Sequence, residues 1–223
     1  MGATMKTALM MAALAVAVGA APAMAQYQPL NEPTHTGPRI EAKIGWDRPT
    51  LDGLLIDDGV TYRDQNGKSG LAYGGEIGYD VQLNSVVLGA YAGVDGSTAK
   101  DCAEVFGLDR ACVKAGRNIT VGGRIGINLD ETFMLYAKGG YSNGRIRYEY
   151  RDFEGFLPDE NYGDNLDGYH VGGGLEFTLG RRVYNRIDYT YTDYSDLTLG
   201  DEGSTAKLKT ARHQVTYGLG YRF

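Results

Sequence analysis

The chain lacks several features that would point to common protein classes. After the first 25 of its 223 residues it has no hydrophobic run of the roughly 20 residues that a membrane-spanning helix needs. It has no cluster of Lys or Arg, and its formal net charge is −6, so nucleic acid is not an expected partner. It has only 6 Pro and 6 Phe beside 33 Gly and 17 Tyr. That mixture favours a curved, all-β fold over a helical bundle.

The first 25 residues have the pattern of an export signal. Lys6 precedes an apolar run over residues 7–21, and Ala23, Met24 and Ala25 fit an A-x-A cleavage site. The alternative, a transmembrane anchor, would need a longer run. We therefore predict a signal peptide at 1–25, a proline-containing periplasmic linker at 26–38 and one folded domain at 39–223.

Beyond the linker, apolar and polar residues alternate with a period of two, which is typical of β-strands with two different faces. At the start of the domain, Ile40, Ile44 and Trp46 share one face while Glu41 and Lys43 share the other. The same alternation recurs over 73–81, 118–129, 133–142, 169–179, 186–192 and 212–223. In 86–95 small residues occupy both phases, so the facing of that strand stays open.

The connections between these segments alternate in length. Short turns lie at 84–85, 130–131 and 180–181, whereas 49–70, 96–116, 151–167 and 195–208 are long and rich in Gly, Asp and Asn. Short turns on one side and long loops on the other are typical of outer-membrane barrels. The sequence predicts an all-β, eight-stranded antiparallel up-and-down transmembrane β-barrel, with both termini on the short-turn, periplasmic side.

A soluble, lipocalin-like barrel also alternates, but its interior is apolar and its exterior charged. The aromatic residues favour the membrane alternative, because their predicted positions form two girdles. One girdle comprises Tyr79, Phe133, Phe177, Tyr221 and Phe223 near the periplasmic rim, and the other Trp46, Tyr73, Tyr141, Tyr169 and Tyr191 near the outer rim.

Four segments carry a family resemblance: GEIGYD at 75–80, GAYAG at 89–93, LYAKGGY at 135–141 and GLGYRF at 218–223. They resemble the small OmpA-like, porin-like outer-membrane proteins of alphaproteobacteria. The resemblance implies an eight-stranded barrel with a structural, surface-exposed role and no single chemistry. It also implies that the closing strand, with Tyr217, Leu219, Tyr221 and Phe223, is the signal read by the outer-membrane assembly machinery.

The sequence offers no enzyme site. It has three histidines, of which His35 lies in the linker. Lipid-deacylating barrels carry a Ser two positions from a His, but neither His170 nor His213 has that neighbour. The acidic pairs beside a His that omptin-type proteases use are not found either. We predict no catalytic residue, no metal ligand and no cofactor, and we expect His170 to be an inward, hydrogen-bonded residue.

The polar phase of the strands predicts a lumen filled with opposite charges. It carries five acids and five bases: Glu41, Glu76, Asp80, Glu176 and Asp188 with Lys43, Arg124, Lys138, Arg186 and Arg212. Buried charges need partners, and we expect pairs such as Glu176 with Arg186 and Lys43 with Glu76. An eight-stranded barrel with such a network would be plugged. The alternative function is a small-solute porin or narrow channel.

Two features of the long connections complete the expectations. Cys102 and Cys112 fall in one connection, and export to an oxidising compartment predicts a disulfide between them, the alternatives being two free thiols or a metal pair. Acidic residues gather in the third connection, where they form either a cation site or a solvated face: Asp152, Glu154, Asp159, Glu160, Asp164 and Asp167. Expected partners are outer-membrane lipid and lipopolysaccharide, the assembly machinery, and host or cell-surface ligands of the loops.

Overall fold

The computed structural model describes residues 35–57, 60–105, 109–152, 160–195, 197–201 and 204–223. The regular elements of these residues are β-strands: β1 Gly37–Asp57, β2 Val60–Gly67, β3 Gly70–Leu83, β4 Val86–Ser97, β5 Lys100–Val105, β6 Asp109–Asn128, β7 Phe133–Asp152, β8 Glu160–Leu179, β9 Val183–Tyr194, β10 Leu197–Asp201 and β11 Ser204–Arg222. Within this part of the chain, no helix is long and apolar enough to cross a membrane. The predicted signal peptide and nearly all of the predicted linker lie outside the described residues.

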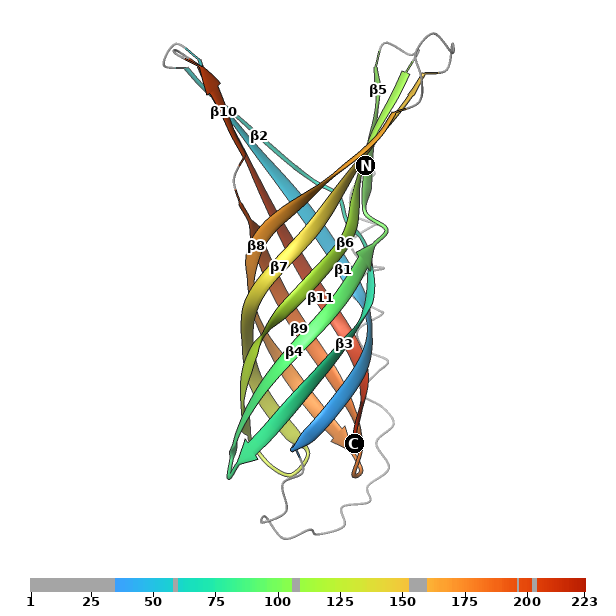
Figure 1. Cartoon of the computed structure of the whole chain (residues 1–223), viewed down its shortest axis with the longest axis vertical. Helices are drawn as coiled ribbons and strands as arrows, with labels where there is room; N and C mark the ends of the chain where they lie inside the picture. Colours follow the sequence, from blue (N-terminus) through green and yellow to red (C-terminus); the bar gives the residue numbers. More distant parts are fainter. Residues whose placement is uncertain (1–34, 58–59, 106–108, 153–159, 196, 202–203) are drawn as a thin grey trace, which may run out of the picture. The chain divides into compact units, whose positions relative to one another are not determined.

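Eight of these strands close into a barrel (Figure 1). Around the barrel the order is β1, β3, β4, β6, β7, β8, β9 and β11, each antiparallel to its neighbours. The last strand pairs with the first over a long register that runs from Arg39 opposite Arg222 to Asp57 opposite Ser204. Closure leaves no free edge in the barrel wall, which is the condition for a sheet to sit in lipid. The predicted fold class is confirmed.

The two faces of the barrel wall have opposite chemistry. Outward residues are large and apolar, as Ile40 at 51% exposure illustrates, whereas the adjacent inward Arg39 is 2% exposed. This is the arrangement of a membrane barrel and the reverse of a soluble one. In β4, whose facing the sequence left open, Val87 and Tyr91 point inward and Leu88 points outward. Gly and Ala occupy positions in both phases of β4, so the period of two could not be assigned from the sequence there.

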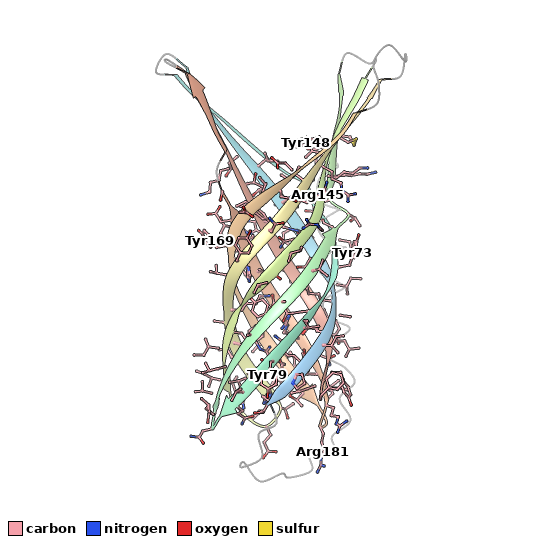
Figure 2. All side chains as sticks on the ribbon, viewed as in Figure 1. Tyr73, Tyr79, Arg145, Tyr148, Tyr169 and Arg181 are labelled. Carbon is pink, nitrogen blue, oxygen red and sulfur yellow. A yellow bond between two sulfur atoms is a disulfide. The ribbon has the colours of Figure 1, made fainter. Side chains whose placement is uncertain are left out.

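Aromatic side chains stand on the outer surface toward both ends of the barrel. Figure 2 shows Tyr79 toward the short-turn end and Tyr73 and Tyr169 toward the opposite end. Each of the three is more than half exposed. An amphipathic ring at these heights suits the headgroup regions on either side of a bilayer.

The predicted long loops are largely β-structure instead. β1 continues to Asp57 and pairs with β2, β5 pairs with β6, β7 and β8 continue as one hairpin, and β10 pairs with β11. Two four-stranded extensions result, which we call the first wing (β10, β11, β1 and β2) and the second wing (β5, β6, β7 and β8); they diverge at the top of Figure 1. Hairpins satisfy their own backbone hydrogen bonds, so pairing continues beyond the apolar band.

The opposite end of the barrel is closed by tight turns. Asn84 and Gly180 adopt positive φ angles of 56° and 75° in the β3–β4 and β8–β9 turns. Gly37 has a φ of 133°, and a Cβ there would lie 2.6 Å from the carbonyl oxygen of Phe223. The amide of Phe223 donates to the carbonyl of Pro38 at 2.9 Å, which fastens the chain's last residue to the start of β1.

Candidate functional site: the barrel lumen and its mouth

The lumen is filled with paired charges. Seven carboxylates and seven Lys or Arg side chains there are at most 8% exposed: Glu41, Asp47, Glu76, Asp80, Asp95, Glu176 and Asp188 with Arg39, Lys43, Arg124, Lys138, Arg186, Arg212 and Arg222. All ten predicted lumen residues are among them. Four further residues were not predicted, although three of them stand on the predicted polar phase and only Asp95 lies in the ambiguous strand: Arg39, Asp47, Asp95 and Arg222.

At the short-turn end, two carboxylates share three guanidinium groups. Arg124 donates from Nε to Asp80 Oδ1 at 2.9 Å and from Nη1 to Glu176 Oε2 at 2.9 Å. Arg222 reaches both acids, at 3.2 Å and 2.8 Å. Arg39 lies 3.2 Å from Asp80 through its Nε. This cluster therefore joins five strands of the barrel wall, β1, β3, β6, β8 and β11.

At mid-height, Glu76 is the centre of a second cluster. Arg39 Nη1 lies 2.7 Å from its Oε1, and Arg186 donates to both of its oxygens at 3.1 Å. Arg186 also lies 2.7 Å from Glu41. Lys43 is 3.9 Å from Glu76, which agrees with the predicted pair, and 2.9 Å from Asp95.

The other predicted pair is wrong. Glu176 and Arg186 are opposite each other in the β8–β9 register, yet no ion pair joins them among the described residues. Glu176 turns to Arg124 and Arg222, and Arg186 turns to Glu41 and Glu76. Inward side chains of a narrow barrel converge on its axis, so a long arginine reaches strands across the lumen as readily as the adjacent one.

A third group surrounds Asp188. Lys138 Nζ lies 2.7 Å from Asp188 Oδ1, and the hydroxyl of Tyr136 donates to Oδ2. The guanidinium groups of Arg124 and Arg186 lie over the Tyr136 ring, 5.4 Å and 5.5 Å from its centroid. The ring thus separates two like charges while offering each its negative face.

His170 is inward and hydrogen-bonded, as expected. Its Nδ1 lies 2.9 Å from Ser142 Oγ, and its Nε2 contacts the hydroxyl of Tyr91. A serine beside a histidine is the start of a nucleophilic site. Here, however, Ser142 is completely buried, and the cavity that His170 and Tyr91 line has a volume of only about 10 Å³. That is room for about one water and none for a substrate.

His35 corrects the predicted linker. Instead of lying outside the barrel, it is fully buried at the short-turn end. Its amide donates to Gln82 Oε1 at 3.0 Å, and its ring Nε2 lies 3.4 Å from Thr178 Oγ1 and 3.9 Å from Glu176. The positive φ of Gly37 turns the preceding chain into the barrel end. The sequence signal that was available is the glycine two positions after the histidine, just before the first strand.

The hairpin end of the lumen is closed by a further pair. Arg212 donates from Nε to Asp47 Oδ1 at 2.7 Å and from Nη2 to Oδ2 at 3.0 Å. Beside it, the hydroxyl of Tyr194 donates to Asn118 Oδ1 at 3.2 Å. A pocket of about 150 Å³ lies between the two wings, on the outer side of the Asp47–Arg212 pair, and we call it the mouth pocket.

The remaining predicted residues lie outside the lumen. Cys102 and Cys112 face each other in the β5–β6 register and form a disulfide, as predicted. In the third connection, Glu154 and Asp159 lie outside the described residues. Within the described ones, no group of three or more His, Cys, Asp or Glu side chains could hold a metal ion. Tyr217, Leu219 and Phe223 lie on the outer surface at 44%, 53% and 66% exposure, and Tyr221 accepts a hydrogen bond from Arg182 at 2.9 Å.

Two solved structures are among those that this chain resembles. Neisserial surface protein A has a solved structure that covers 84% of this chain and 98% of its own, with a TM-score of 0.48 and 11% identity. The outer membrane protease OmpT from Escherichia coli matches over 86% of this chain and 98% of its own, also with a TM-score of 0.48 and 11% identity.

Sequence relatives are more informative. The 31 kDa outer-membrane immunogenic protein of Brucella melitensis is 31% identical over 160 residues, which cover 69% of this chain and 67% of the relative. The 22 kDa outer membrane protein of Rhizobium leguminosarum is 27% identical over 160 residues, 68% of this chain and 66% of the relative. A family model described as the outer membrane protein beta-barrel domain matches residues 11–223. The chain belongs to this family of outer-membrane β-barrels, and the resemblance drawn from its sequence is confirmed.

Proposed function

We propose that this protein is a closed outer-membrane anchor with a structural and surface-interaction role, in envelope integrity and in contacts made by its two wings. The main support for this proposal is the filled lumen. Seven acids and seven bases neutralise one another inside eight strands, and the cavity that Lys43, Tyr91 and His170 line in the lumen has a volume of only about 10 Å³. An ion-selective pore would more naturally present an excess of one sign at a constriction.

The proposed partners follow from the surface. The apolar outer wall contacts outer-membrane lipid and lipopolysaccharide. The assembly machinery recognises the closing strand with Phe223. The wings meet host or cell-surface ligands. The names of relatives from Brucella melitensis and Brucella suis include the word immunogenic, which fits hairpins that are accessible from outside. Export requires a cleavable signal peptide, which we place at 1–25.

We also propose that the protein is not an enzyme. The buried Ser142–His170 pair is the nearest approach to a nucleophile and base in the described lumen, and it has no space for a substrate. The second ring nitrogen of His170, Nε2, contacts the hydroxyl of Tyr91, where a catalytic triad has a carboxylate.

Planar-bilayer recording of the refolded protein tests the anchor against the porin. The anchor proposal expects at most small, rare conductances, together with a weakened envelope in a deletion strain. Large, steady single-channel currents from the wild-type protein would replace it with the porin alternative.

A further inference from the structure

The mouth pocket concentrates positive charge in a chain whose net charge is −6. Of its nineteen lining residues, six are Lys or Arg and one is an acid: Lys68, Lys100, Lys114, Arg117, Arg145 and Arg212, with Asp101. Both wings contribute to the wall, through β1 and β11 on one side and β5, β6, β7 and β8 on the other. The charge is therefore assembled by the fold from distant segments and is not a local run of the sequence.

Part of this charge is already neutralised, and part is not. Arg212 is paired with Asp47, and Lys68 lies 3.4 Å from Asp101. Within the part of the chain that the structure describes, Arg117 donates to the neutral amide oxygen of Asn143 at 3.3 Å and to no carboxylate. Arg145 forms no ion pair among the described residues, and its Nε is buried without a hydrogen-bond partner. The pocket therefore contains two guanidinium groups without a carboxylate partner among the described residues, and an anion in the pocket would supply one.

The position of Arg145 is fixed by its surroundings. A Cβ at Gly163 would lie 3.1 Å from Arg145 Nε and 3.2 Å from Nη2, so the glycine on β8 leaves the space in which the guanidinium lies. Figure 2 places Arg145 at the hairpin end of the barrel, below Tyr148. A guanidinium is a planar fork of donors that matches carboxylate, phosphate and sulfate groups.

The rest of the wall is apolar. Leu51, Val113, Ile146 and Leu166 line the pocket beside the arginines. A volume of about 150 Å³ corresponds to a cavity that accommodates one benzene ring. The ligand that fits both features has a single anionic group on a short apolar body. Its path inward ends at the Asp47–Arg212 pair, so such a ligand would be held at the mouth.

We propose that the mouth pocket binds a small amphipathic organic anion, with Arg145 and Arg117 holding the charged group and the aliphatic side chains covering the apolar body. This inference goes beyond the proposed anchor role and does not depend on it, because binding at the mouth and conductance through the lumen are measured separately.

Phenyl phosphate is a suitable probe, titrated by calorimetry into the refolded protein in detergent micelles, with the arginine Nε–Hε signals followed by NMR. We expect saturable one-site binding and a shift of the Arg145 signal. Arg145→Gln and Arg117→Gln should each weaken binding about tenfold, because each removes a charge-assisted hydrogen bond. Arg147→Gln is the matched control, because Arg147 is an exposed arginine on the same strand and does not line the pocket. This variant should bind phenyl phosphate as tightly as the wild-type protein does.

Three comparisons decide the chemistry. Benzyltrimethylammonium, of similar size and opposite charge, should not bind, and inorganic phosphate should bind about tenfold more weakly than phenyl phosphate. The proposed site would be refuted if the cation bound as tightly as phenyl phosphate, or if Arg145→Gln and Arg147→Gln lost the same amount of phenyl phosphate affinity. Binding of inorganic phosphate as tight as that of phenyl phosphate would show that the apolar wall does not contribute. Heat-dependent gel migration establishes that each variant is folded.

The anionic group that the pocket binds can belong to a free solute or can be a phosphate of lipopolysaccharide. Titration in vesicles that contain lipopolysaccharide distinguishes these sources. Equal phenyl phosphate affinity in micelles and vesicles assigns the pocket to a free solute. An affinity about tenfold weaker in the vesicles assigns it to the lipopolysaccharide phosphate, with the same two arginines as ligands.

Discussion

Arg124 connects three strands of the barrel at its short-turn end, so replacing it tests whether the lumen is closed by ion pairs. Its guanidinium, from β6, contacts Asp80 on β3 through Nε at 2.9 Å and Nη2 at 2.5 Å, and Glu176 on β8 through Nη1 at 2.9 Å. Arg124→Met keeps a long side chain and removes the charge and all three hydrogen bonds.

The size of the effect follows from what remains. Removing one partner of a buried ion pair costs about 3–5 kcal/mol. Here Asp80 keeps Arg39 and Arg222, both at 3.2 Å, and Glu176 keeps Arg222 at 2.8 Å. The loss should therefore fall at the lower limit, about 3 kcal/mol. Neutralising the acid as well, in Arg124→Met with Glu176→Gln, restores equal numbers of charges and should recover about 1–2 kcal/mol.

Urea unfolding in lipid vesicles measures both variants, with the fluorescence of Trp46, the only tryptophan, as the signal. Planar-bilayer recording of Arg124→Met should also reveal a leak. Arg147→Met is the control, because it removes an exposed arginine and should leave both measurements unchanged. A loss of stability under about 1 kcal/mol together with unchanged conductance would refute the reasoning.

Three further predictions concern the wall and the wings. Thiol labelling of the denatured, non-reduced protein should detect no free thiol at Cys102 or Cys112, and two reactive thiols would contradict the disulfide. Phe223→Asp should leave the chain in the periplasm while the wild-type barrel shows heat-dependent gel migration, whereas normal surface delivery would count against the assembly role. Gly220→Val should lower the free energy of unfolding by about 2 kcal/mol through overpacking, because a Cβ there would lie 2.1 Å from Tyr184 Cζ; an unchanged unfolding midpoint would exclude that contact.

The facing of the strands could be predicted from the sequence, because a period of two assigns every second residue to the lumen. Glu76 and Arg186 were placed correctly on that basis alone. Their ion pair was not predicted, because the prediction considered only residues opposite each other on neighbouring strands. In a narrow lumen a long side chain also reaches residues on more distant strands. In the structure Arg186 lies 3.1 Å from Glu76 on the opposite wall, although Glu176 is its neighbour in the register.

Two other differences between the prediction and the structure also arise from contacts between segments, at His35 and in the wings. His35 precedes the first strand, and only the turn at Gly37 directs it into the barrel end. The wings contain Gly, Asp and Asn, which favour loops locally. Backbone pairing between adjacent segments outweighs that local preference, as in β1 with β2 from Thr50 opposite Gly67 to Asp57 opposite Val60. Neither outcome is visible in single-residue propensities.

Three pairs of Tyr and Gly fill part of the lumen. Tyr91, Tyr136 and Tyr184 are inward-facing, and the residue directly opposite each on a neighbouring strand is a glycine: Gly122, Gly174 and Gly220. A Cβ at any of the three would lie between 2.1 and 2.8 Å from the tyrosine side chain. A narrow barrel accommodates a ring only where the facing position is empty, and the ring in turn covers the exposed backbone of the glycine. Filling the lumen in this way leaves the charged side chains between the rings with protein partners in place of water, so the three Tyr–Gly pairs help to close the barrel.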